Sequence, residues 1–527
     1  MQPAERRRAV WSVYLVGAID CADAALLPGC FRSLETEMAL RPSTLAALVL
    51  AQSVAGALAC PAWGYVVDAG GWERRDLLVL GCCWWAAASV LSALALGFWS
   101  LLLARTLLGV ALPLVSPLSQ SIIADLFDEK DRGKAFGASA MWCTVGTALG
   151  GIGGTALSNH RVPFLGASLA GWRAVFLIGA LCCAVVAAQV AWCCPAIPRT
   201  GGTGTVSKLA QDWRTVARAV GRNRTWQLLT AQSLFGGLPF AGFHFLTLLM
   251  QYAGYQDAVA AVLLGAHRFG SAAGSLLGGH IGDAVAAAGY NRVRVAQGSV
   301  AWLLVFLLIL ISALEQNVLA RNNPTATGGG THTGGDATST PVAPLMLAAI
   351  LFMWGLGGSF CEVGCDLPIL AEVAATSDGV SSNRASMIAY KRAVQGVINP
   401  LGAPIVGMLA EHVYGYRPTT ESVAALEPLH RSTNALALGS SLRTLALLCW
   451  PVCFVGYGTV GRHYAQHQRQ VAYAQQSGDR ERQLTELRAQ LQNQNELQDE
   501  MQRTQAALLA AKRQQQQQQQ QQQKYLR

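Results

Sequence analysis

Apolar runs long enough to cross a bilayer recur along the whole chain, and this recurrence limits the folds that are open to it. About 20 residues are needed to cross a hydrocarbon core of about 30 Å. The runs predict twelve transmembrane helices, near residues 10–31, 43–66, 76–97, 99–124, 135–157, 172–194, 225–252, 258–281, 295–314, 344–370, 385–411 and 437–460. Only 13% of the 527 residues are charged, about half the share in ordinary soluble domains. The sequence therefore predicts an all-α, multi-pass membrane protein.

Basic residues in the loops set the predicted orientation. Lys and Arg gather in the cytoplasmic loops of membrane proteins. Here they gather before the first run and after the second, fourth and sixth runs, whereas the alternate loops carry few. Both termini are therefore expected in the cytoplasm. This bias also accounts for the net charge of +9, so no nucleic-acid partner is predicted.

A polar link divides the chain into two groups of six runs, residues 1–194 and 225–460. The link, residues 195–224, is predicted to contain a basic amphipathic helix in the headgroup layer. Residues 461–527 form a Gln-rich tail that ends in a run of glutamines, 514–523. The tail begins a coiled-coil heptad with leucines, but glutamines take the next core positions, so a polar helix or disorder is predicted. Its role stays open between clustering or placement in the cell and an inert extension.

The two halves carry the same short motif at the ends of the second and eighth runs. A glycine is followed four residues later by an aspartate: Gly64 and Asp68, with Arg74 and Arg75 beyond them, and Gly279 and Asp283. Glycine lets helices approach closely, and an aspartate at a helix end can hold a neighbouring helix. With Asp125 and Arg132 after the fourth run, these residues are expected to form a cytoplasmic gate. The alternative is a basic loop that only follows the topology rule.

A duplicated unit of six spans resembles the major facilitator superfamily, in which the binding site lies near the midplane between the halves. Arg105 and Gly109, in "RTLLG", are similar to another motif of that superfamily. A narrower resemblance is to its spinster-like branch, in particular the plant, algal and protist members. It rests on "ADAALLPG" (22–29), "SIIADLFDEKDRGKAFG" (121–137), "AGWRAVF" (170–176), "PILAEV" (368–373) and "LAEHVYGYRP" (409–418).

The resemblance implies a secondary transporter and, as in animal spinsters, lysolipid or sphingoid substrates with proton coupling. The chain departs from the animal pattern at two places. Cys21, rather than an arginine, follows Asp20, and the apolar "VALP" of 110–113 stands where an acidic residue is expected.

Two carboxylates, Asp20 and Asp23, lie inside the first run. Each would cost about 2.5–3.5 kcal/mol as an ion at the centre of a lipid-facing helix, so their shared face must point inward. A rise of about 1.5 Å per residue places Asp23 and Arg105, of the fourth run, at similar depths. We expect these two to pair across the cavity, with Asp20 as the more readily protonated carboxylate. The alternative is an ion pair that only stabilises the first half.

The second half has intramembrane polar groups of its own: His267 and Arg268 in the eighth run, and Glu362 and Asp366 in the tenth. Two interpretations stay open. In the first interpretation, the negative charges of the two acidic residues are neutralised by the positive charges of Lys391 and Arg392, and the role of all four is structural. Alternatively, Arg268 faces an anionic head group and His267 relays a proton.

These features predict a secondary active transporter that moves a small organic or amphipathic solute by alternating access. The chain contains no H-E-x-x-H, G-x-S-x-G or intact Walker A pattern, so neither an enzyme nor a metal or cofactor is predicted. A non-transporting sensor or scaffold is the alternative, and the long polar tail keeps it open.

Overall fold

The computed structural model of this chain describes residues 3–69, 73–127, 129–164, 167–194, 221, 223–322, 342–376, 384–421 and 426–525. The chain forms two compact units, Met1–His463 and Tyr464–Arg527. The predicted link helix within 195–224 lies almost entirely outside the described residues.

The first half of the first unit is a bundle of long helices: α1 (Pro3–Gly29), α3 (Pro42–Ala69), α4 (Arg74–Ala93), α5 (Phe98–Leu126), α6 (Glu129–Ser158) and α7 (Gly171–Cys193). A short helix, α2 (Phe31–Met38), connects α1 to α3. Strands β1 (Arg161–Phe164) and β2 (Ala167–Ala170) form an antiparallel hairpin between α6 and α7. The sequence analysis did not predict this hairpin, which is too short and too polar to stand out among apolar runs.

The second half contains several spans that are interrupted by 3-10 or π turns. Its elements are α9 (Arg224–Gly242), η1 (Phe243–Phe245), α10 (Leu246–Tyr252), α11 (Asp257–Ala287), α12 (Val293–Asn322), α13 (Pro344–Gly358), η3 (Glu362–Asp366), α14 (Leu367–Thr376), α15 (Arg384–Ile398), η5 (Asn399–Leu401), α16 (Gly402–Met408), η6 (Leu409–Val413) and α17 (Pro428–Tyr525). Pro400 lies in η5, where its missing N–H interrupts the α-helical hydrogen bonds. The eleventh apolar run is therefore interrupted at Pro400.

Nine helices among the described residues are long and apolar enough to cross a membrane. The predicted runs that fall outside this set lie on α6, α11 and α13. Helix α13 is only 15 residues long before the chain passes into η3, and α6 and α11 contain charged residues and many glycines. The protein is thus a multi-pass membrane protein whose described residues are helical apart from one short hairpin and the connecting turns.

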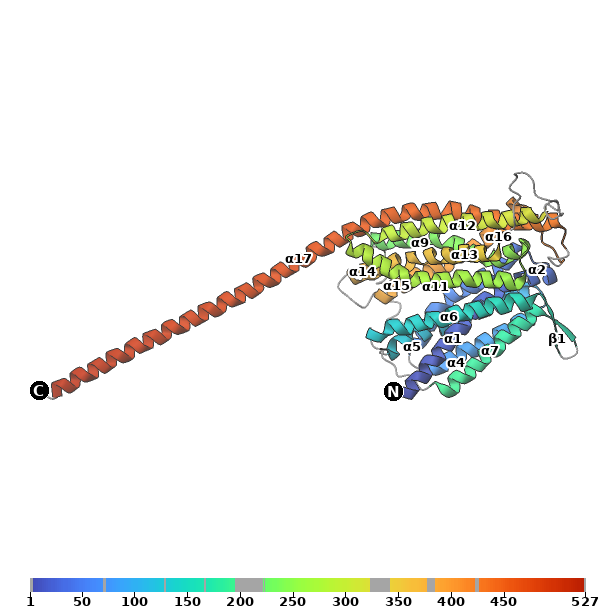
Figure 1. Cartoon of the computed structure of the whole chain (residues 1–527). Coiled ribbons are helices and arrows are strands. Elements are labelled where there is room, and N and C mark those ends of the chain that lie inside the picture. Colours follow the sequence, from blue (N-terminus) through green and yellow to red (C-terminus); the bar gives the residue numbers. More distant parts are fainter. Residues whose placement is uncertain are drawn as a thin grey trace. The chain divides into compact units, whose positions relative to one another are not determined.

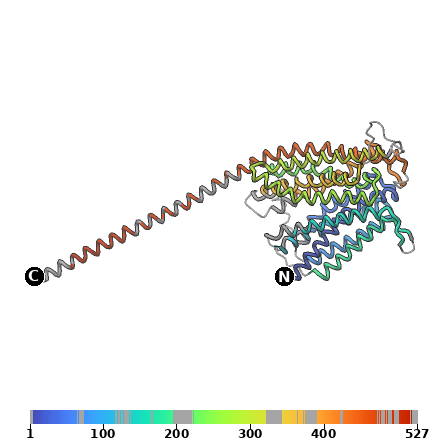
Figure 2. The backbone as a smooth tube through the Cα atoms, in the orientation of Figure 1, coloured from blue at the N-terminus to red at the C-terminus, as the bar shows by residue number. Residues whose placement is uncertain are grey.

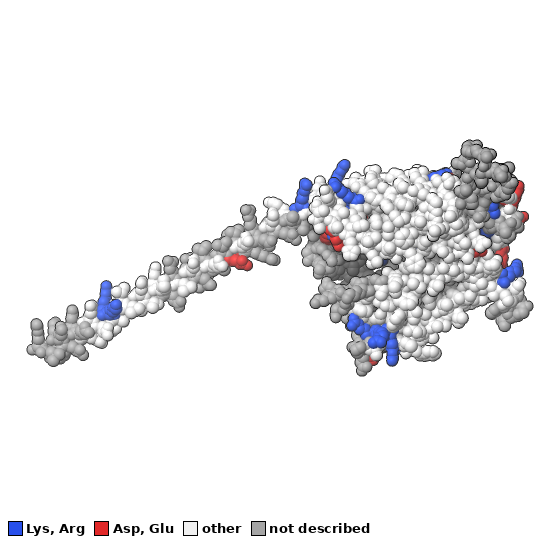
Figure 3. All heavy atoms as spheres, in the orientation of Figure 1, with Lys and Arg blue, Asp and Glu red and all other residues white. Residues whose placement is uncertain are grey.

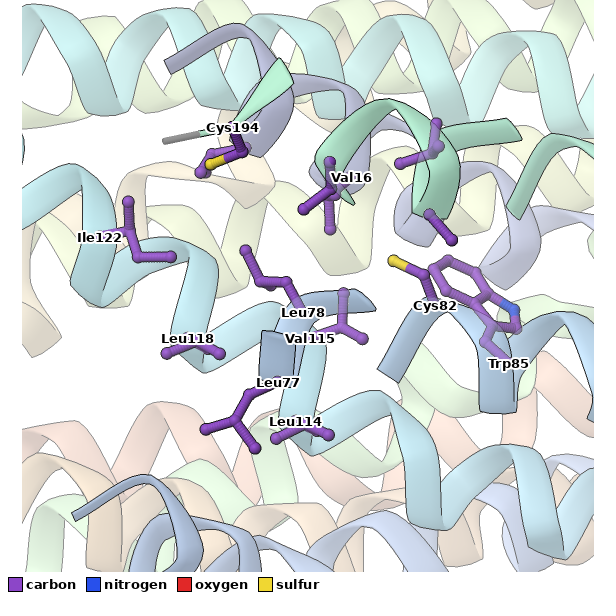
Figure 4. Packing of buried hydrophobic residues seen from close by; sticks show 14 of the residues in the cluster. Val16, Leu77, Leu78, Cys82, Trp85, Leu114, Val115, Leu118, Ile122 and Cys194 are labelled. Carbon is purple, nitrogen blue, oxygen red and sulfur yellow. The ribbon is translucent and has the colours of Figure 1, made fainter. Parts of the chain in front are cut away.

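The first half is held together by an apolar core around α4 and α5 (Figure 4). Val16 of α1, Leu77 and Trp85 of α4, and Val115 of α5 are each no more than 1% exposed. Burying a large apolar side chain contributes roughly 1.5–3 kcal/mol. This packing fixes α1 against α5, which are the two helices that carry Asp23 and Arg105.

The glycine-rich stretch of α6 packs directly on α1. A Cβ atom added at Gly146 would lie 1.9 Å from the main-chain oxygen of Ala18, and one added at Gly150 would lie 2.3 Å from that of Ala22. Only glycine allows the two backbones to approach so closely. These glycines therefore serve helix packing beside the acidic face of α1.

The two halves lie side by side along their helices (Figures 1 and 2). We call the end of the bundle where α1 begins the proximal end, and the end that carries α2 and the hairpin the distal end. Hydrogen bonds join the halves at the distal end: the Ser43 amide donates to Glu411 Oε1 at 2.7 Å, and Asn159 Nδ2 donates to Asp257 Oδ2 at 2.7 Å. Figure 3 shows a hollow between the halves at the proximal end.

The second unit, Tyr464–Arg527, consists of the C-terminal part of α17, which continues as a helix to Tyr525. Beyond Tyr464 at its start, its large apolar side chains that the structure describes are exposed, as Leu497, Met501 and Leu508 illustrate. Taken by itself, this unit is a polar helix without an apolar core among its described side chains.

Candidate functional site

A buried ion pair lies in the interior of the first half. Asp23 of α1 and Arg105 of α5 approach to 3.7 Å between Oδ2 and Nη1, and their side chains are 5% and 1% exposed. The Arg105 guanidinium lies over the ring of Phe176 of α7, 4.2 Å from its centroid. The pair is therefore enclosed by three helices of one half.

This ion pair lacks several of the hydrogen bonds that buried charges normally make. Among the described residues, Asp23 Oδ2 and all three guanidinium nitrogens of Arg105 have no hydrogen-bond partner. A buried polar group left unsatisfied costs about 1–3 kcal/mol, and more when it is charged. The arrangement can therefore gain free energy when a ligand or a second conformation supplies the missing partners.

The enclosure of the pair corrects one detail of the sequence analysis. Asp23 and Arg105 were expected to face each other across the cavity between the halves. The helical rise gives the depth of a residue but not the direction of its side chain. In the structure, Phe176 and the neighbouring helices cover the pair, so it lies within the first half instead.

Asp20 lies one helical turn nearer the proximal end than Asp23, and its side chain is half-buried. It is engaged in an interaction of its own. The next residue, Cys21, lies within electrostatic range of Arg268, which belongs to the second half. Asp20 itself lies within electrostatic range of Cys82 of α4 and Cys183 of α7, so it lies near helices of the first half.

The two polar residues of α11 have different surroundings. Arg268 is exposed near the middle of the helix, although α1 of the other half lies within its electrostatic range. The His267 ring packs on Trp354 of α13, with 4.7 Å between the ring centroids. Arg268 is therefore available to a ligand, whereas His267 contributes to packing between helices.

The remaining charges of the second half lie in pairs. Lys391 Nζ donates to Asp366 Oδ2 at 3.0 Å, and the Tyr457 hydroxyl donates to Asp366 Oδ1 at 2.8 Å. Glu362 and Arg392 approach only to 4.0 Å and are largely exposed. This arrangement fits the interpretation that these charges cancel.

The residues of the expected cytoplasmic gate are only partly described. The surroundings of Gly64 and the side chains of Asp68, Asp125 and Arg132 lie outside the described part of the structure. Helix α4 begins at Arg74, which is engaged in an interaction of its own, and Arg75 pairs locally with Asp76 at 3.0 Å. Gly279 lies one turn before Asp283 on α11, and Asp283 pairs with Arg292 at 2.8 Å, nine residues along the chain.

The sequence analysis missed a polar cluster at the distal end. It consists of Arg32 and Glu35 of α2, Tyr252 of α10 and Tyr416, which follows η6. The signal that could have found it is the pair of opposite charges, three residues apart, directly after the first apolar run. Its partners lie more than 200 residues away and could not be identified by spacing.

Two bundles of membrane helices that are joined at one end and hollow at the other define a membrane carrier with a site between its halves. The chain belongs to the Major Facilitator Superfamily, whose family model matches residues 13–377. The members of this family are membrane transporters rather than enzymes.

Solved structures of transporters are similar to this chain. A bacterial homologue of the human lysosomal transporter Spinster, in its inward-facing and unoccupied conformation, is 19% identical with a TM-score of 0.67, over 88% of this chain and 99% of that one. The inward-facing and occupied conformation of such a homologue is 18% identical with a TM-score of 0.66, over 88% of this chain and 98% of that one. A D-xylose-proton symporter is 16% identical with a TM-score of 0.58, over 84% of this chain and 97% of that one. At these identities the likeness shows the fold alone.

A curated relative matches over a shorter stretch. The probable 4-methylmuconolactone transporter of Cupriavidus pinatubonensis (strain JMP 134 / LMG 1197) is 26% identical over 175 residues. The matched stretch covers 33% of this chain and 39% of that relative.

Proposed function

We propose that this chain is a secondary active transporter of the spinster-like type, which moves a small organic or amphipathic solute by alternating access. The observation that carries the proposal is the exposed Arg268 at mid-helix, between halves that are joined at the distal end and hollow at the proximal end. A charge at this depth is costly unless it faces a water-filled cavity or a counter-charge. We infer that Arg268 binds an anionic group of the solute, as in lysolipids or phosphorylated sphingoid lipids.

The proposed orientation places the proximal end in the cytoplasm. The basic residues before α1 and at the start of α4, such as Arg6 and Arg74, support it because such residues gather in cytoplasmic loops. The structure then corresponds to an inward-open state with its external side closed. The twelve-span count, with both termini cytoplasmic, belongs to the same proposal.

Proton coupling is assigned to the acidic face of α1. Asp23 Oδ2 lies 3.7 Å from Arg105 Nη1 and has no hydrogen-bond partner among the described residues, and Asp20 lies one turn away on the same helix. A carboxylate that changes its surroundings during the cycle changes its affinity for a proton. Neutralisation of Asp20 or Asp23 would therefore move the balance between the two access states.

The test begins with the full chain purified from membranes and a mass-spectrometric census of the lipids and solutes that copurify with it. The protein is then reconstituted into liposomes, and uptake is measured for lysophosphatidylethanolamine, lysophosphatidylglycerol, sphingosine and D-xylose. The proposal expects saturable uptake of an anionic amphiphile, reduced by roughly tenfold or more in Arg268→Gln. Arg392→Gln, whose side chain is exposed and weakly paired, is the matched control.

Equal uptake in wild type and Arg268→Gln would contradict the assignment of Arg268. Uptake of none of the probes would favour the second candidate, a non-transporting sensor or scaffold. The specific observation behind that candidate is the separate C-terminal unit, Tyr464–Arg527. A variant that ends at residue 465 separates the two, because a transporter keeps its turnover when the tail is removed.

A further inference from the structure

The polar cluster at the distal end is buried to an unusual degree for four residues that can carry charge. Arg32, Glu35, Tyr252 and Tyr416 are 2%, 0%, 0% and 4% exposed. Arg32 and Glu35 belong to the first half, and the two tyrosines belong to the second. Around them, Phe31 of α2 packs on Phe245 of η1, with 5.4 Å between the ring centroids.

The Glu35 carboxylate is the centre of the cluster. Its Oε2 atom accepts hydrogen bonds from Arg32 Nη1 and from the Tyr252 hydroxyl, both at 2.9 Å, and its Oε1 atom accepts from the Tyr416 hydroxyl at 2.6 Å. Each hydrogen bond of this kind contributes about 0.5–1.5 kcal/mol. One side chain of the first half thus binds two hydroxyls of the second half.

Arg32 strengthens the same connection. It donates to the Tyr252 hydroxyl at 2.5 Å and to the main-chain oxygen of Glu421, and its guanidinium lies 5.0 Å from the centroid of the Tyr252 ring. Tyr252 and Glu421 both belong to the second half. The distal end cannot open while these bonds between the halves persist.

Glu35 also responds to pH in a definite direction. The groups that face its carboxyl are Arg32 from α2, Tyr252 from α10 and Tyr416 from the segment after η6. Burial raises the pKa of Glu35 above its ordinary value, although Arg32 and the two hydroxyls oppose the shift. Opening would expose the carboxyl and return its pKa to the ordinary range. The closed form therefore binds the proton more tightly and is favoured as the pH falls through its pKa; opening is favoured as the pH rises.

We propose that Glu35 is a pH-dependent latch that joins the two halves at the distal end and controls the opening of the transporter on that side. The inference rests on the proposed transport function, because only a transporter needs to open at this end. The latch requires no added group. In the closed form at low pH, the Glu35 carboxyl keeps its proton, which it shares with the Tyr416 hydroxyl 2.6 Å from Oε1, while Oε2 accepts from Tyr252. When the proton leaves, the buried carboxylate becomes costly to keep out of water, and the bonds to Tyr252 and Tyr416 are exchanged for water as α2 separates from the second half.

The neighbouring carboxylate on the same helix provides a matched control. Glu37 Oε2 accepts a hydrogen bond from Trp172 Nε1 at 2.6 Å, and Arg173 lies 3.9 Å from its other oxygen. Both partners belong to the first half. Neutralising Glu37 therefore changes the charge of α2 without removing a bond between the halves.

The experiment measures opening directly by hydrogen exchange and mass spectrometry, on the full chain in lipid nanodiscs, from about pH 5 to about pH 8. The peptides that cover 31–38 and 414–421 report on the two sides of the latch. After correction for intrinsic exchange, wild type is expected to exchange roughly three- to tenfold faster at the high-pH end. Glu35→Gln is expected to lose this dependence, and Glu37→Gln to keep it.

A second variant keeps the inference testable if Glu35→Gln does not fold. Tyr416→Phe removes one hydrogen bond from the carboxylate and leaves the charge in place, so its exchange should be faster at every pH with the pH dependence retained. Two results would overturn the latch: an exchange rate in Glu35→Gln that depends on pH as in wild type, or an exchange rate in wild type that does not depend on pH. Exchange does not depend on a solute, so pH-dependent opening without uptake would contradict the transport function and leave the latch intact.

Discussion

The buried ion pair Asp23–Arg105 of the first half and the buried ion pair Asp366–Lys391 of the second half differ in how completely their hydrogen bonds are satisfied. In the second half, Lys391 and Asp366 are 3.0 Å apart, and Tyr457 binds the other carboxylate oxygen. In the first half, Asp23 and Arg105 are 3.7 Å apart, and the Arg105 nitrogens have no hydrogen-bond partner in the part of the chain that the structure describes. The Asp366–Lys391 pair, whose hydrogen bonds are made, stabilises one conformation. The Asp23–Arg105 pair would be stabilised by a rearrangement that supplies the missing hydrogen-bond partners. Burial of a charge alone does not distinguish these two roles.

The largest effect on stability is expected from breaking the satisfied pair. Asp366→Asn removes the counter-charge of the buried Lys391 and should lower the free energy of unfolding by roughly 3–5 kcal/mol. The measurement is the unfolding of the purified protein by SDS in mixed micelles. Glu362→Gln is the control, because its exposed pair with Arg392 should contribute no more than about 1 kcal/mol. Equal midpoints for the two variants would show that the Asp366 pair is not structural.

Replacing both members of each pair by apolar residues sharpens the comparison. Asp23→Leu with Arg105→Met removes several unsatisfied groups, so the first half should become more stable by roughly 1–4 kcal/mol. Asp366→Leu with Lys391→Met takes the carboxylate acceptor away from Tyr457 and should give no such gain. The same unfolding experiment measures both. A loss of stability in the first double variant, equal to that in the second, would remove the distinction between the pairs.

The smallest effect is expected at the proximal surface. Asp283 pairs with Arg292, but the Asp283 side chain is 74% exposed. Exposed pairs of this kind contribute about 0–1 kcal/mol, so Asp283→Asn should leave the unfolding midpoint close to that of wild type. A shift as large as that of Asp366→Asn would mean that Asp283 holds more than this one arginine.

Asp68→Asn, in the first half, is expected to slow transport without preventing folding, and a wild-type rate would remove its gate assignment.

The sequence allowed the relative depth of Asp23 and Arg105 to be predicted, because the rise of a helix per residue is constant. It placed Asp23 and Arg105 at one level, but the direction of their side chains depends on how α1, α5 and α7 pack. The partners of Asp366 could be inferred only in part: Lys391 was one of two neighbouring basic residues, and Tyr457 lies in a distant helix. The cluster around Glu35 was missed because it forms only when α2, α10 and the segment after η6 come together.

Uptake as a function of external pH is the most direct test of the role proposed for the first half. The solute is the one identified by the liposome panel, and the variants are Asp20→Asn, Asp23→Asn and the control Glu362→Gln. Wild type and the control should show uptake that changes with pH. Asp23→Asn should lose roughly tenfold or more of the rate, and at least one of the two aspartate variants should lose its pH dependence. A wild-type rate and a wild-type pH profile in both aspartate variants would contradict proton coupling through α1.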